Sequence, residues 1–232
     1  MKKELFVLCL VLLPLYNYVF AGNPTTKEFN FDAITEVALE SSFNVSIKYG
    51  AKQKVVITGS DEHIEKLNVR LKGKRLLLGM KKGRYNNLNL KAEITIPYLD
   101  MAIVAGSGDM EIGAFDNLSN LGLIVSGSGN IITTSTVAVQ NTVDIKISGS
   151  GNIRVNGTAS HSNILISGSG DSRASKLKTS SNNSLISGSG NAEIDVTNKL
   201  SATLSGSGNV YYTGAPAIDR QEIGSGRVKP NY

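Results

Sequence analysis

Cysteine, tryptophan and histidine are scarce in this chain. Its 232 residues include one cysteine, Cys9, no tryptophan and two histidines, His63 and His161. Cys9 lies in a leading apolar segment, so a chain that loses this segment has no disulfide, no thiolate nucleophile and no cysteine metal site. The histidines lie far apart in the sequence and provide no local metal cluster or catalytic triad. We therefore expect no metal and no cofactor.

The first 21 residues have the composition of a secretory signal peptide. Lys2 and Lys3 provide a positive start, an apolar run covers 5–15, and a cleavage site follows Ala21. This run is too short to predict a membrane span. We expect a mature chain of residues 22–232 with no transmembrane segment, located in the periplasm, at the cell surface or in the medium. Export would separate it from nucleic acid, which we exclude as a partner.

A Gly-Ser-Gly-Asn/Asp tetrapeptide recurs six times in the second half of the chain. The copies lie at 106–109, 127–130, 149–152, 168–171, 188–191 and 206–209, and an altered copy at 224–227 ends in Arg. Their first glycines are separated by 21, 22, 19, 20, 18 and 18 residues. A period near 20 is typical of a solenoid coil, which buries its apolar face only when several coils stack.

Aliphatic residues flank each copy at alternating positions. Two residues before the first glycine the chain has Val104, Val125, Ile147, Ile166, Ile186 and Leu204. Alternation predicts a strand on each side of a tight corner, where glycine and asparagine would accept positive φ angles. The predicted fold is all-β, a single-stranded parallel β-helix-like solenoid with coils of about 18–22 residues and Gly-Ser-Gly-Asn/Asp corners. Stacking would align the serines and the asparagines in two ladders.

Residues 29–100 lack the tetrapeptide and show less regular β patterns. We expect strands around 29–31, 43–47, 54–58 and 92–96, a hairpin about Gly73, and a helical turn near 61–67. This part would supply irregular first coils and a cap, before regular repeats over 101–226 and a tail at 227–232. Residues 22–232 would then form one domain.

Two segments near the start, together with the repeats, resemble a known family. They are 29–34 (FNFDAI) and 43–50 (FNVSIKYG), followed by repeated ISGSGNI coils. The chain resembles the putative auto-transporter adhesin, head GIN domain family over about residues 29–226. The resemblance implies an exported β-helix-like protein and brings no catalytic residues with it.

The glycine-rich copies also suggest a phosphate loop or a calcium site. No copy has the third glycine of a dinucleotide fingerprint or the Lys-Ser/Thr of a P-loop. Calcium-binding β-rolls carry an acid in each shorter repeat, whereas only Asp109 and Asp171 are acidic here. We interpret the copies as structural corners.

Charged residues supply the candidate ligand contacts. Arg154 and Arg173, five residues after their first glycines, would be neighbours on adjacent coils with Glu193 beside them, a contact for an anion or uronate or else an ordinary charged face.

Residues 66–91 carry nine basic side chains and no acid, and Lys72, Lys74 and Arg75 are the candidates that this cluster offers. The cluster would attract an anionic glycan or a membrane surface, or else act as a solvated strand face.

These features predict a non-enzymatic, exported binding or adhesin-like module of the cell envelope. Its partner would be an anionic glycan or another envelope component. The alternatives are a carbohydrate-active enzyme, a polysaccharide lyase or hydrolase with an outer groove near Arg154, Arg173 and Glu193, and a purely structural envelope component. The lack of tryptophan weakens sugar stacking in either functional case.

Overall fold

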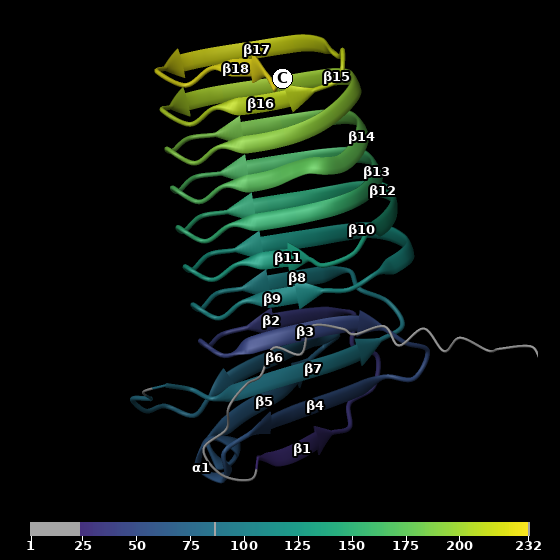
Figure 1. Cartoon of the computed structure of the whole chain (residues 1–232), viewed down its shortest axis with the longest axis vertical. Helices are drawn as coiled ribbons and strands as arrows, with labels where there is room; N and C mark the ends of the chain where they lie inside the picture. The colour runs from purple at the N-terminus through teal and green to yellow at the C-terminus, as the bar shows by residue number, and fades with distance from the viewer. Residues whose placement is uncertain (1–23, 86, 232) are drawn as a thin grey trace, which may run out of the picture.

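The computed structural model describes residues 24–85 and 87–231, which contain eighteen strands and one short helix. The predicted signal peptide, residues 1–21, lies outside the described residues. Within the described ranges, no helix has the length and hydrophobicity to cross a bilayer. Coils stack into a tall column, which confirms the predicted β-solenoid (Figure 1).

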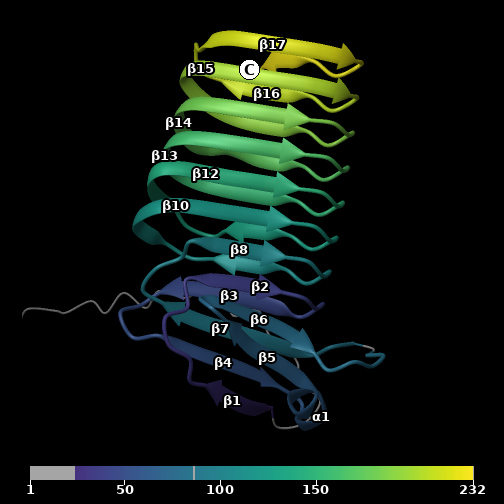
Figure 2. The same ribbon diagram turned by 180° about the vertical axis from the view of Figure 1, so that it is seen from behind.

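Each coil contributes a strand to each of two facing layers, and tight corners join the layers along one side of the column (left in Figure 1). The first layer has the spatial order β5 (Leu67–Lys72), β6 (Arg75–Met80), β2 (Glu36–Leu39), β8 (Met101–Val104), β10 (Phe115–Val125), the second halves of β12 (Val137–Ile147), β13 (Ile153–Ile166), β14 (Ser172–Ile186) and β15 (Ala192–Gly206), and β17 (Ala217–Gly224). The second layer has the order β1 (Thr25–Phe29), β4 (Lys54–Gly59), β7 (Leu90–Ile96), β3 (Asn44–Tyr49), β9 (Met110–Ile112), β11 (Ile131–Thr133), the first halves of β13, β14 and β15, β16 (Val210–Thr213) and β18 (Val228–Pro230). Strands β13 to β15 curve from one layer into the other on the side opposite the corners (Figure 2).

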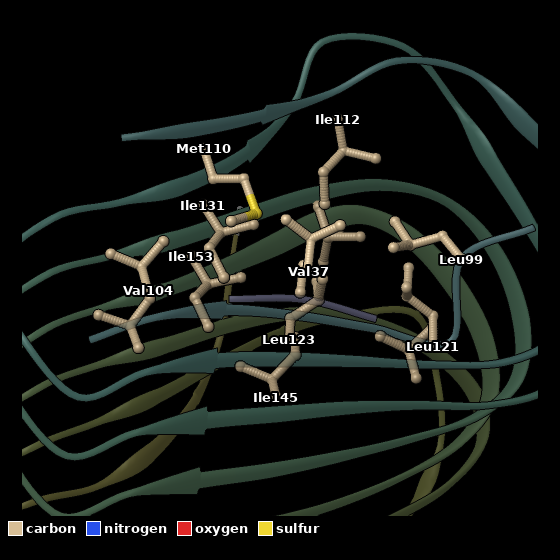
Figure 3. Close-up of a cluster of buried hydrophobic side chains, with 14 of the residues drawn as sticks. Val37, Leu99, Val104, Met110, Ile112, Leu121, Leu123, Ile131, Ile145 and Ile153 are labelled. Carbon is tan, nitrogen blue, oxygen red and sulfur yellow. The ribbon is translucent and has the colours of Figure 1, made fainter. Parts of the chain in front are cut away.

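Parallel pairing keeps equivalent residues of successive coils in register. Val125, Ile147, Ile166, Ile186 and Leu204 pair in turn, and all are buried. In the other layer Met110, Ile131 and Ile153 follow one another in the same way (Figure 3). The aliphatic columns predicted from the sequence therefore form the continuous core, where each buried side chain contributes about 1.5–3 kcal/mol.

The coils do not stack in the order of the chain. The first coil, β2 with β3, lies between the coil of β6 and β7 and the coil of β8 and β9. On its way from β7 to β8, the chain must therefore run past the end of β3, and residues 97–100 make this crossing. This crossing clamps the first coil between two later ones.

Antiparallel strands cover the N-terminal end of the column. β1 pairs with β4, β4 with β7, and β5 with β6. The β5–β6 hairpin turns at Gly73, whose φ is 61°, and α1 (Asp61–Glu65) links β4 to β5. The hairpin and helical turn predicted from the sequence are both present.

Charged side chains occupy the inward columns of the last coil. Arg220 and Glu222 pair with Ala202 and Leu204, which are buried. Arg220 Nη1 lies 3.7 Å from Glu222 Oε1, and Glu222 Oε1 accepts the Val228 N–H at 2.8 Å. Inward charges oppose further strand addition. This end of the core is thus closed by a polar plug instead of a cap of strands.

Candidate functional site

The corner glycines allow close stacking of corners. A Cβ atom at Gly127 would lie 2.0 Å from the Gly106 carbonyl oxygen, and one at Gly151 would lie 1.9 Å from that of Gly129. Among the corner glycines of the described chain, only Gly224 has a φ in the left-handed region, at 114°. The expectation of positive φ at the corners is therefore wrong for the six regular copies. Glycine is required there because the neighbouring backbone occupies the space of a side chain.

A ladder of side-chain acceptors runs along the corners. Asn130 Oδ1 accepts the Asn152 N–H at 3.0 Å, and Asn152 Oδ1 accepts the Asp171 N–H at 2.9 Å. The same bond joins the other successive corners, from Asn44 Oδ1 to the Arg227 N–H. Asn and Asp both fit because the required atom is Oδ1. The serines are exposed, and none of them donates or accepts a side-chain bond along the described corners, so only one of the two expected ladders is hydrogen-bonded.

An additional corner at Ser41–Asn44 is hidden in the sequence. It packs directly against the corner at 106–109, where a Gly106 Cβ would meet the Ser41 carbonyl oxygen and a Gly108 Cβ that of Phe43. On the opposite side of Ser41–Asn44, β6 and β7 are joined by a link that projects from the column (Figure 1). The side chain of Ser41 is partly exposed and that of Phe43 is buried in the core, so this corner accommodates both. The detectable signal was Asn44-Val45-x-Ile47, which matches Asp109-Met110-x-Ile112.

The structure brings Arg154 and Arg173 to adjacent coils, with Glu193 on the next. Arg173 Nη2 lies 3.8 Å from Asp171 Oδ2, whereas Arg154 has no ion-pair partner among the described residues. Glu193 Oε2 accepts a bond from Ser175 Oγ at 3.2 Å. Both arginines line a hollow of about 200 Å³ together with Asn130, Ile132 and Asn152. This arrangement can hold an anionic group.

The basic cluster at 66–91 is partly neutralised. Arg75 Nε lies 2.6 Å from Glu36 Oε2, and Arg70 Nη2 lies 3.7 Å from Glu40 Oε2. Lys72 and Lys74, near the turn of the β5–β6 hairpin, have no ion-pair partner in the described part of the chain. Of the three candidate residues in the cluster, Arg75 is thus committed to a carboxylate of β2, and the two lysines can contact a ligand.

A cleft that sequence reasoning missed lies on the side opposite the corners, where the cap meets the regular coils. We call it the tyrosine cleft, and its volume is about 700 Å³. It is lined by Lys48 and Tyr49 from the end of β3, Tyr98 from the crossing at 97–100, and Asp116 and Asn117 from the start of β10. These residues lie up to 69 positions apart in the sequence, so no local motif marks them.

Within the described residues, no group of three or more His, Cys, Asp or Glu side chains is arranged to hold a metal ion.

Comparisons with known proteins identify the same architecture. A family model described as "Putative auto-transporter adhesin, head GIN domain" matches residues 30–216. No curated protein sequence matches the chain. A crystal structure of a putative adhesin from Bacteroides fragilis is similar over 90% of this chain and 97% of its own, with 22% identity and a TM-score of 0.81.

Two further crystal structures have the same fold. A putative adhesin from Parabacteroides merdae shares 20% identity, with a TM-score of 0.70 and coverage of 92% of this chain and 98% of its own. A protein from Parabacteroides distasonis named a putative lipid binding protein shares 21% identity, with a TM-score of 0.71 and the same coverage. At these identities the likeness establishes the fold alone.

Proposed function

The chain belongs to the putative auto-transporter adhesin, head GIN domain family, and from that premise we propose that it is an exported, non-enzymatic binding module of the cell envelope. Its proposed partner is an anionic glycan or another anionic envelope component. Binding would take place on the outer faces of the stacked coils.

The observation that supports this proposal most is the fixed register of the outward-facing residues. One outward column of the second layer consists of Glu111, Ile132, Arg154, Arg173, Glu193 and Tyr211. Strand pairing and the corner ladder hold these side chains about 4.8 Å apart from coil to coil. A repeating ligand can contact several coils at once, so weak contacts add.

Unpaired basic groups give the column its preference for anions. Arg154 lacks a carboxylate partner among the described residues, and its neighbour Arg173 has only a long contact to Asp171. Two guanidinium groups on adjacent coils can bind one carboxylate, sulfate or phosphate with charge-assisted hydrogen bonds. Lys72 and Lys74 add positive charge at the N-terminal end of the column.

The hollow that Arg154 and Arg173 line favours binding over acid–base chemistry. Its lining residues are two arginines, two asparagines and Ile132, with no carboxylate among those described. The nearby Asp171 uses Oδ1 to accept the Asn191 N–H at 2.9 Å, as part of the corner ladder. Glycoside hydrolysis needs two carboxyl groups that face one scissile bond. A binding role fits this arrangement better than glycoside hydrolysis does.

A glycan array that includes sulfated and uronate-containing glycans tests the proposal on residues 22–232. We expect binding to at least one acidic glycan, and an R154E/R173E double variant should weaken it about tenfold or more. K72E/K74E should weaken it less. K176E/K178E is the matched control, because both lysines are exposed and the net charge change is the same. No binding to any acidic glycan, or equal loss in all three variants, would contradict the proposal.

A further inference from the structure

The tyrosine cleft has the features of a ligand site. Its chemistry differs from that of the outward column that contains Arg154 and Arg173. Exposed aromatic surface is rare in this protein, which has no tryptophan and 6% aromatic residues. Tyr49 is nevertheless 58% exposed, and it lines the same cleft as Tyr98. The cleft volume of about 700 Å³ lies within the range of small-molecule sites.

Both tyrosines are held in place before any ligand arrives. The ring of Tyr49 contacts the buried Phe115 edge to face, with centroids 6.2 Å apart. Tyr98 Oη accepts the backbone N–H of Ser119 at 2.5 Å. Fixed aromatic rings bind a ligand with little loss of side-chain entropy.

One of the residues that line the cleft has a strained backbone. Asn117 is not a glycine, yet its φ is 65°, and β10 shifts its register against β12 between Phe115 and Leu118. Gln140 Nε2 donates a hydrogen bond to Asn117 Oδ1 and fixes the amide. Non-glycine residues in this region of φ are uncommon and cluster at ligand sites. The bulge places Asp116 and Asn117 at the edge of the tyrosine cleft.

The charges around the cleft are balanced. Lys48 and Asp116 both line it, and neither has an ion-pair partner among the described residues. An anionic ligand would lose to Asp116 much of what it gains from Lys48. The site therefore favours an uncharged ligand with many hydroxyl groups.

We propose that the tyrosine cleft binds a neutral hexopyranose residue of a glycan. The apolar C–H face of the sugar ring packs against a tyrosine ring, while Asp116 and the Asn117 side chain accept hydrogen bonds from its hydroxyl groups and Lys48 donates one. This assignment rests on the proposed binding function, and it adds a neutral subsite to the anion-binding column.

The test uses neutral ligands and residues 22–232. Saturation-transfer NMR with methyl pyranosides of glucose, galactose, mannose and N-acetylglucosamine identifies binders, and a titration with the best one gives its affinity. Tyr49→Ala should lower that affinity about tenfold or more. Tyr85→Ala is the matched control, because it removes a partly exposed tyrosine that lies between β6 and β7, outside both proposed sites.

A second variant separates binding from folding. Asn117→Gly relieves the left-handed backbone and removes the amide, so its thermal unfolding temperature should stay the same or rise while sugar affinity falls several-fold. Binding of these sugars should also be insensitive to salt up to 0.5 M and unchanged in R154E/R173E.

Three results would overturn the assignment. They are that no neutral pyranoside binds, that binding survives Tyr49→Ala, and that an apolar peptide binds in the tyrosine cleft while the sugars do not. Acidic glycans that still bind and still require Arg154 and Arg173 would leave the proposed function intact. The two proposals can thus fail separately.

Discussion

The regular coils at 101–226 and the irregular part at 25–100 build the same corner from different residues. In the regular coils every corner packs on another corner, and both glycines are needed because a Cβ would enter the neighbouring backbone. At Ser41–Asn44 the chain makes the equivalent corner with Ser and Phe. On its other side β6 and β7, which pair with β2 and β3, are joined by residues 81–89 instead of a tight corner. Glycine at this corner therefore reflects a close neighbour and not the bend itself.

The two ends of the column are also closed by different means. Antiparallel strands and α1 cover the first coils, whereas charged side chains close the last. Arg227 extends this closure, because its guanidinium donates hydrogen bonds to the Gly224 and Gly226 carbonyl oxygens at 2.9 and 2.6 Å. In the regular coils the carbonyl equivalent to that of Gly224 accepts amides of the next corner. Arg227 thus replaces a following coil.

The largest expected effect comes from filling the space at a stacked corner. Gly151→Ala puts a Cβ 1.9 Å from the Gly129 carbonyl oxygen, so the coils must separate locally. We expect a loss of about 3 kcal/mol or more in the free energy of unfolding, measured by urea denaturation. Ser41→Ala, at the equivalent corner of the first coil, should change the free energy of unfolding by less than about 0.5 kcal/mol. Equal effects would remove the distinction between the two regions.

Loss of a ladder acceptor should have the next largest effect. Asn152→Ala leaves the Asp171 N–H without its acceptor and removes the bond from Asn152 Nδ2 to Asn130 Oδ1. The expected cost is about 1–3 kcal/mol, again from urea denaturation. Asn152→Asp keeps an acceptor at the same position and should cost less. If aspartate is as harmful as alanine, the acceptor role of Oδ1 is wrong.

Removal of the polar plug should change association more than stability. The double variant R220L/E222L extends the aliphatic columns to the end of the core and exposes an apolar surface there. We expect it to form end-to-end dimers or larger species at micromolar concentration, detected by light scattering after size exclusion. The control Lys178→Leu adds an apolar side chain on the curved side. If the R220L/E222L variant has the mass of the wild type, these charges do not prevent end-to-end association.

The smallest effect is expected at the Glu36–Arg75 ion pair, which joins β2 to β6. The side chains of Arg75 and Glu36 are 40% and 27% exposed, so solvent and salt screen the pair. Arg75→Ala should cost about 0–1 kcal/mol in thermal unfolding, and less at 1 M salt. Lys74→Ala, one residue away and without an ion pair in the described chain, should have no measurable effect.

The regular coils could be predicted because each coil repeats its neighbour's chemistry. The column from Val104 to Leu204 fixes both period and inward face, and the structure keeps the predicted register. The reason for the corner glycines could not be predicted, because it depends on the backbone of another coil. The first corner was hidden for the same reason, since Phe43 takes a place where the motif requires glycine.

The placement of the charged and aromatic residues was less accessible to sequence reasoning. Arg154 and Arg173 were correctly expected on adjacent coils, because they share a position in the repeat. The first coil is inserted between two later ones. This insertion pairs Arg75 with Glu36 and brings Tyr49 and Tyr98 to the same cleft. Nothing local in the sequence encodes that crossing, since its residues 97–100 carry no motif.

Residue-resolved amide hydrogen exchange at the corners tests the central claim most directly. The amides of Asn130, Asn152, Asp171, Asn191 and Asn209 belong to partly exposed turns, yet each donates to an Oδ1 of the preceding coil. We predict that they exchange as slowly as the strand amides around Ile147, because exchange requires neighbouring coils to separate. Exchange at the rate of an unstructured peptide would contradict a ladder that holds the coils in register.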